Sequence, residues 1–69
     1  MSMTEKIKIV LVKKKMTITQ LAEALETSQS NLSKKMKRDN FSEKELEQIA
    51  EVLGIGYEAN FILEDGTKV

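Results

Sequence analysis

The residues best suited to chemistry lie between Ser28 and Arg38, where polar and basic side chains surround only two apolar ones, Leu32 and Met36. If a helix turns these two residues toward a core, steps of about 100° per residue bring polar side chains to the opposite face. That outward face carries Ser30, Asn31, Lys34, Lys37 and Arg38, with Gln29 and Ser33 at its margins. Glutamine and asparagine can pair with adenine, lysine with guanine, and flanking cations with phosphates. The pattern favours a DNA-reading helix, and an ordinary solvated helix face is the alternative.

Hydroxyl residues mark the starts of four helices that must position this face. Ser2, Thr17 and Ser42 are each followed three residues later by Glu or Gln, which is the pattern of a capping box. Ser28 supplies a fourth cap, and Gly54 is a predicted helix stop because glycine adopts the left-handed conformation without strain. The apolar residues that recur at helical spacing form the predicted core: Met3, Ile7, Val10, Leu11, Ile18, Leu21, Ala22, Leu25, Leu32, Met36, Leu46, Ile49, Ala50 and Leu53.

A very short connection, Glu26-Thr27-Ser28, separates the second and third predicted helices. It lets both apolar faces meet one core only through a sharp helix-turn-helix. The predicted fold class is therefore mainly α. We expect a helix-turn-helix DNA-binding domain over residues 1–56 and a C-terminal β-strand or short hairpin over residues 57–69, a possible dimerisation element.

The period of the sequence changes after residue 56, where apolar residues fall at every second position. This alternation predicts a strand over residues 57–63, and Asp65-Gly66 predicts a hairpin turn after it. Two roles compete for the strand. It can fold back over its own first helix and cover a second apolar stripe, Ile9 and Val12, or it can pair with a second subunit. The predicted dimerisation residues are Tyr57, Ala59, Phe61 and Leu63.

Composition excludes several classes of protein. The chain has 69 residues with no Cys, His, Trp or Pro, so disulfides and thiolate or imidazole metal sites are excluded and an enzyme is not expected. No apolar run approaches the roughly 20 residues that span a bilayer, which predicts a cytoplasmic protein without a membrane partner. We expect no cofactor, no metal and no small-molecule ligand. A core this small is marginal, which favours a homodimer.

Charge is unevenly distributed along the chain, although its total is zero. Up to Asn40 there are nine basic and four acidic residues, a net charge of +5, and beyond it two basic and seven acidic residues, a net charge of −5. Such an asymmetry can turn a basic face toward phosphates while an acidic face is repelled. Ordinary solvated helix faces would also give this distribution.

An ordered set of residues between Met16 and Ile55 carries a further indication. The set is Met16-Thr17, Leu21-Ala22-Glu23-Ala24-Leu25, Thr27-Ser28-Gln29-Ser30-Asn31-Leu32-Ser33, Phe41-Ser42, Leu46, Ile49-Ala50 and Leu53-Gly54-Ile55. It resembles the lambda-repressor-like helix-turn-helix regulators, often called the Cro or XRE type. The resemblance implies a compact bundle of four or five helices whose third helix enters the major groove of double-stranded DNA, usually as a dimer on a near-palindromic site. It also implies a sequence-specific transcriptional regulator of repressor type.

The resemblance assigns roles to particular positions. Gln29, Ser30 and Lys34 stand where the family reads base edges, with Asn31 beside them. The family contacts phosphates from the start of its second helix and from the loop after its third. The corresponding residues here are Thr17, Thr19, Lys37, Arg38 and Asn40, and we add Ser28 and Lys35 to the expected phosphate contacts.

Three departures from the family pattern matter. Ile18 replaces a glutamine that often anchors a phosphate, so the resemblance does not imply that contact here. Glu26 replaces the family glycine in the turn, which requires a positive φ at a residue with a Cβ or a different turn. Leu11 and Met36 stand where the family commonly pairs a buried Arg with a Glu, and replacing both partners by apolar residues can be neutral or stabilising.

A second function, from a different class, stays open beside DNA reading. A small helix-turn-helix bundle can serve as a protein-interaction or antitoxin-like module whose acidic half binds another protein. Salt separates the two functions, because each phosphate neutralised on DNA adds about 0.9 to the log-log salt slope.

Overall fold

Each of the four predicted caps begins a helix. The computed structural model describes all 69 residues and contains α1 (Met3–Lys14), α2 (Ile18–Ala24), α3 (Gln29–Arg38) and α4 (Glu43–Leu53). Ser2, Thr17 and Ser42 form complete capping boxes, and the Ser28 hydroxyl accepts a hydrogen bond from the Asn31 amide at 3.1 Å. Helix α4 ends at Gly54 in the left-handed conformation, as predicted. None of the helices is long and apolar enough to cross a membrane.

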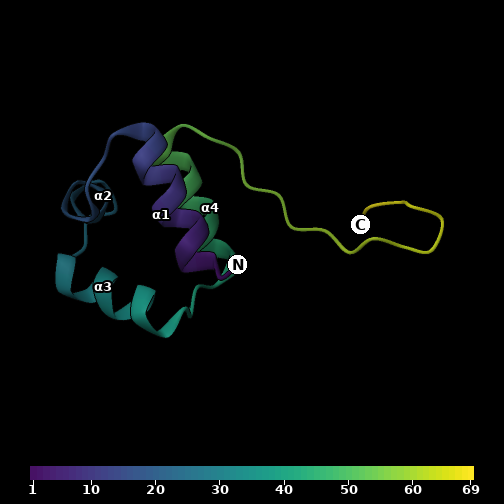
Figure 1. The fold of residues 1–69 in the computed structure, drawn as a ribbon, viewed down its shortest axis with the longest axis horizontal. Helices are drawn as coiled ribbons and strands as arrows, with labels where there is room; N and C mark the ends of the chain where they lie inside the picture. The colour runs from purple at the N-terminus through teal and green to yellow at the C-terminus, as the bar shows by residue number, and fades with distance from the viewer.

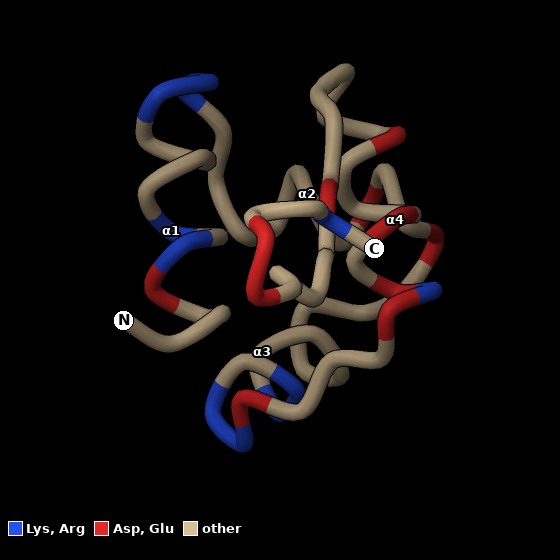
Figure 2. The backbone as a smooth tube through the Cα atoms, turned by 90° about the vertical axis from the view of Figure 1, so that its right-hand side faces the viewer, with Lys and Arg blue, Asp and Glu red and all other residues tan.

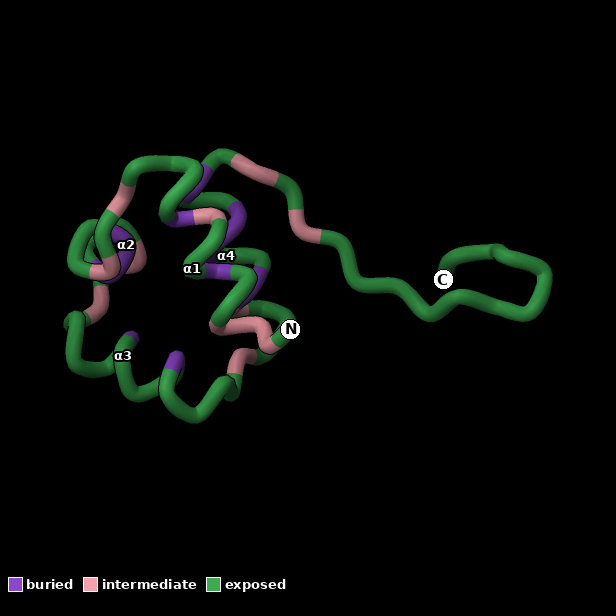
Figure 3. Tube along the Cα trace, in the orientation of Figure 1, coloured by how far each residue is buried: buried purple, intermediate pink, exposed green.

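The helices enclose one apolar core (Figure 1). Helices α1 and α4 run alongside each other, while α2 packs against α3 and α4. Figure 3 shows that the buried segments of the bundle face inward. The buried core residues are Ile7, Leu11, Leu21, Ala22, Leu32, Met36, Leu46, Ile49, Ala50 and Leu53, all of them predicted. The other predicted core residues, Met3, Val10, Ile18 and Leu25, are half-buried and pack against this cluster.

Two of the family departures have clear structural outcomes. Leu11 and Met36 are both buried, so the positions where the family commonly places an ion pair belong to an apolar core here. Glu26 has a φ of 58°, which confirms that a non-glycine residue takes the left-handed conformation in the turn. The Thr27 amide donates to the Ala22 carbonyl at 3.0 Å across this turn, and α2 ends at Ala24, four positions before Ser28, the cap of α3.

The predicted strand over residues 57–63 is wrong. The structure contains only an isolated antiparallel bridge between Ile62 and Lys68, flanked by two hydrogen bonds between Phe61 and Val69 of 2.7 and 2.8 Å. Residues 57–60 have no neighbouring strand to pair with, and a two-stranded hairpin alone is at best marginally stable in water. A short hairpin remains, turning through Asp65 and Gly66.

The chain does not fold back over its own α1, which makes that interpretation of the C-terminal segment wrong for this structure. Val12 is 77% exposed and Phe61 is 81% exposed, so neither covers the other. Tyr57 is half-buried and packs against the bundle core. Residues 58–69, named the arm below, are exposed throughout. Residues 58–60 still line a hollow with α1 and α4, and the hairpin that follows them extends away from the bundle (Figure 1).

Candidate nucleic-acid interface

All four predicted base-reading residues lie on α3 and are exposed. Gln29, Ser30 and Asn31 occupy its first turn, and Lys34 follows one turn later. Helix α3 forms one edge of the bundle in Figure 1, and its buried segments face the other helices in Figure 3. The structure therefore presents the polar face of this helix to solvent.

The first residue of α3 is tied to the start of α2. The Thr19 hydroxyl donates a hydrogen bond to Oε1 of Gln29 at 3.0 Å. Because the amide oxygen receives this bond, the NH₂ group of Gln29 stays available to donate to an acceptor on a base. Sequence analysis predicted both residues as part of the interface. It did not predict their contact, because the hydrogen bond joins two different helices across the turn.

Asp39, the residue that follows α3, is hydrogen-bonded to the start of α1. The Thr4 amide donates to Oδ1 of Asp39 at 2.8 Å, and the Thr4 hydroxyl lies 2.9 Å from the same oxygen and 2.7 Å from the Met36 carbonyl oxygen. These hydrogen bonds, with the Thr4 amide first, lower the pKa of Asp39. Asp39 is the left-handed cap residue of α3, so the contact fixes the end of the helix.

The middle of α3 is joined to α4 by an ion pair between Lys35 and Glu45. The bond from Lys35 and that from the Ser42 amide lower the pKa of Glu45 to about 2. Lys35 also lines a hollow between α3 and α4 together with Phe41 and Gln48. Lys35 therefore lies toward α4, and the phosphate contact expected of it remains a prediction that requires this ion pair to open.

Helix α3 is thus held by a side-chain contact with each of the other three helices: with α1 near its end, with α2 at its start and with α4 in between. None of these contacts could be predicted from spacing, because each joins residues of different helices. A helix fixed in this way presents its outward residues in one arrangement, which reduces the ordering cost when they meet a ligand.

The other expected phosphate contacts lie around the two ends of the helix-turn-helix. Thr17 and Ser28 are the caps of α2 and α3, and Thr17 already bonds to Gln20 within its capping box. Thr19 is exposed in the first turn of α2. Lys37 and Arg38 lie exposed in the last turn of α3, and Asn40 follows it. Contact with DNA is untested for all of them.

Charge separates in space as well as along the chain. In Figure 2 the basic positions gather on α1 and α3, whereas α4 carries mainly acidic ones. The three lysines Lys13, Lys14 and Lys15 end α1 shortly before the start of α2. A polyanion would therefore be attracted to the side of the molecule that carries α1 and α3 and repelled from α4.

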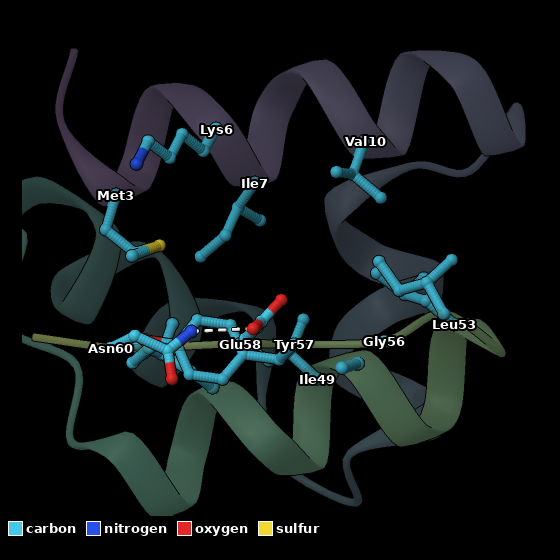
Figure 4. Close-up of a pocket in the computed structure, with 14 residues that line it drawn as sticks. Met3, Lys6, Ile7, Val10, Ile49, Leu53, Gly56, Tyr57, Glu58 and Asn60 are labelled. Carbon is cyan, nitrogen blue, oxygen red and sulfur yellow. Dashed lines mark hydrogen bonds between the residues drawn. The ribbon is translucent and has the colours of Figure 1, made fainter. Parts of the chain in front are cut away.

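Another hollow lies between α1 and α4 (Figure 4). It has a volume of about 530 Å³, and most of its lining is apolar. Tyr57 and Ile49 lie along one wall and Ile7 and Val10 along the other. The only hydrogen bond drawn there joins Asn60 to Glu58 at 2.7 Å. No three acidic side chains lie close enough together to hold a metal ion.

Comparison of the chain with models of protein families identifies its family. The model of the Cro/C1-type HTH DNA-binding domain matches residues 6–58. The chain belongs to this family. Membership confirms the resemblance seen in the sequence and makes the protein a DNA-binding regulator with double-stranded DNA as its partner, in a family that is typically non-enzymatic. The match ends at residue 58, where the exposed arm begins.

Two further comparisons add nothing to this assignment. Neither the curated proteins nor the solved structures gave a match to the chain.

Proposed function

We propose that this Cro/C1-type protein is a sequence-specific transcriptional regulator of repressor type that reads the major groove with α3. The observation that carries the proposal is the exposed polar face of α3, fixed by contacts with α1, α2 and α4. A helix fits the major groove, where each base pair presents a distinct pattern of donors and acceptors. A rigid helix with amide and ammonium groups on one face suits that pattern.

The proposed roles divide α3 and its flanks into two groups. Base edges are read by Gln29, Ser30, Asn31 and Lys34. Phosphate contacts position the helix without carrying sequence information. These contacts come from Thr17, Thr19, Ser28, Lys35, Lys37, Arg38 and Asn40.

The proposed regulator acts as a homodimer. A pair of copies places two α3 helices on half-sites about 34 Å apart, one turn of DNA. The arm supports this proposal because its apolar residues Ala59, Phe61 and Leu63 are exposed in the single chain. Tyr57 packs on its own bundle, so its proposed part in dimerisation is to hold the residue that precedes the arm against the bundle.

Salt dependence of DNA binding tests the proposal. Affinity for a duplex should fall steeply between low and physiological salt, and Lys37→Ala should reduce the log-log slope by about 0.9. The matched control is Lys44→Ala, an exposed lysine on acidic α4 that should leave the slope unchanged. No binding even at low salt would contradict the proposal and favour the protein-interaction module.

A further inference from the structure

The outer side of α1 carries an apolar surface without a cover. Ile9 and Val12 are 42% and 77% exposed, on the side of the helix away from buried Ile7. They line a shallow hollow together with Lys8 and Lys13. This hollow, named the α1 face below, therefore combines two apolar side chains with two positive charges.

The arm carries a second shallow hollow of the opposite charge. It is lined by Ile62, Leu63, Glu64 and Asp65, next to the bridge that closes the hairpin. Ile62 is 72% exposed, so its side chain has no cover within the chain. The arm hollow thus combines two apolar side chains with two negative charges.

We propose that the arm hollow of one copy docks on the α1 face of a second copy. Ile62 and Leu63 then cover Ile9 and Val12 of the other chain. Glu64 and Asp65 of the arm lie opposite the two lysines that flank this face. The inference rests on the proposed homodimer and adds which two surfaces form it.

The docking is reciprocal. Each copy contributes one arm and one α1 face, so a two-fold axis creates two identical contacts and leaves neither surface open. Opposite charges around an apolar centre also disfavour other pairings, because an arm facing an arm or a face facing a face would bring like charges together.

The partner is a second copy because the hairpin at the end of the arm extends beyond its own bundle. The molecule extends over 42 × 23 × 20 Å, with the arm along the longest dimension in Figure 1. The six residues from Gly56 to Phe61 can span about 20 Å when extended, which reaches a neighbouring subunit. Edge pairing between two arms is less favoured, because the hairpin has a single bridge, Ile62 to Lys68, and so offers only a short edge.

Charge exchange between two variants tests the docking. The face variant carries Lys8→Glu and Lys13→Glu, and the arm variant carries Glu64→Lys and Asp65→Asn. Asparagine is chosen because its oxygen can still accept the hydrogen bond from the Thr67 amide, which lies 2.9 Å from Asp65. All four residues are exposed, so the helices should form normally in circular dichroism.

Sedimentation equilibrium without DNA gives the readout. Each variant alone should dimerise at least about tenfold more weakly than the original chain, because like charges meet at both contacts. An equimolar mixture should recover the dimer, since the acidic arm of one variant meets the unchanged lysines of the other and the basic arm meets the new glutamates. Val12→Ser should also weaken the dimer without any change of charge.

The control is Lys44→Glu, the same change of charge on α4, which should leave the dimer unchanged. A face variant that dimerises as tightly as the original chain would overturn the inference, since the arm would then bind elsewhere. So would a mixture that stays monomeric, or an original chain that is monomeric at all concentrations. DNA binding of the monomer is measured separately, so these outcomes leave the reading role of α3 to its own test.

Discussion

In the helical bundle Leu21 is 0% exposed, whereas in the arm Phe61 is 81% exposed. The bundle buries its apolar residues by arranging four amphipathic helices around them. The arm has one isolated bridge and leaves the apolar side chains Phe61, Ile62 and Val69 exposed. Both regions contain large apolar side chains, so the difference lies in whether other parts of the same chain pack against them.

This contrast separates two kinds of stability. The bundle derives its stability from contacts within the chain, because burial of apolar surface is the main favourable term in folding. The arm leaves its large apolar side chains exposed, and in the proposed homodimer a second copy covers them. Changes in the bundle should therefore alter folding, and changes in the arm should alter association.

The largest expected effect breaks the bundle and spares the arm. Leu21→Ala should lower the free energy of unfolding by about 2 to 5 kcal/mol, because it leaves a cavity in the core. Phe61→Ala removes a larger side chain, yet should change the unfolding of the monomer by no more than about 0.5 kcal/mol. Urea unfolding at a concentration where the protein is monomeric measures both. Equal losses for the two variants would show that the arm folds onto the bundle.

The second prediction compares a substitution in the bundle that should change base preference with one in the arm that should change overall DNA affinity. Gln29→Ala should reduce discrimination at one base pair by roughly 1 to 3 kcal/mol, because it removes the amide from the face proposed to read bases. Phe61→Ser should weaken binding to all sequences alike, since it would act through the proposed dimer. Competition assays with single-base variants of a selected site measure both. Equal losses on cognate and random DNA from Gln29→Ala would remove the role proposed for that residue.

A third prediction uses the two turns. Both regions place a residue in the left-handed conformation, Gly66 in the arm with a φ of 88° and Glu26 in the bundle with a φ of 58°. Glu26 carries a Cβ that is strained in this conformation, whereas Gly66 has none. Glu26→Gly should therefore raise the free energy of unfolding by up to about 1 kcal/mol. Glu23→Gly, inside α2, should lower it by about 1 kcal/mol. Thermal unfolding that gives both changes the same sign would refute the strain at Glu26.

The smallest effect is the dependence on pH. The pKa of Glu45 falls from its ordinary value of 4.5 to about 2 in the folded chain. The stabilisation it provides is therefore present above about pH 4.5 and is lost as the pH falls toward 2. Glu45→Gln should make helix unfolding less sensitive to acid over this range, while keeping an amide oxygen for the Ser42 cap.

The arm provides the control for this measurement. Hydrogen bonds from Thr67 lower the pKa of Asp65, but they hold only the arm turn. Asp65→Asn should therefore leave the acid unfolding of the helices unchanged by circular dichroism. An equal effect of the two substitutions would mean that the turn and the bundle unfold together.

Local rules predicted the bundle well. The caps Ser2, Thr17, Ser28 and Ser42 were predictable because capping involves residues three positions apart, and all four begin helices. The core followed from helical spacing for the same reason. The positive φ of Glu26 was one of the two outcomes that the replacement of the family glycine left open.

Contacts between elements were beyond these rules. The bonds of Thr19 with Gln29 and of Thr4 with Asp39 depend on how the helices cross, and no spacing encodes that. The strand over residues 57–63 failed for a related reason. Alternation indicates which side chains could share a face, but a strand forms only where another strand supplies its hydrogen bonds. The bundle offers none.

The most direct test of sequence reading by α3 is selection from a pool of random DNA duplexes at two salt concentrations, followed by sequencing of the retained DNA. The proposed function predicts a near-palindromic site, with half-sites about 34 Å apart and retention that falls steeply as salt is raised. Retention without any common sequence would contradict base reading by α3, and no retention even at low salt would contradict DNA recognition itself.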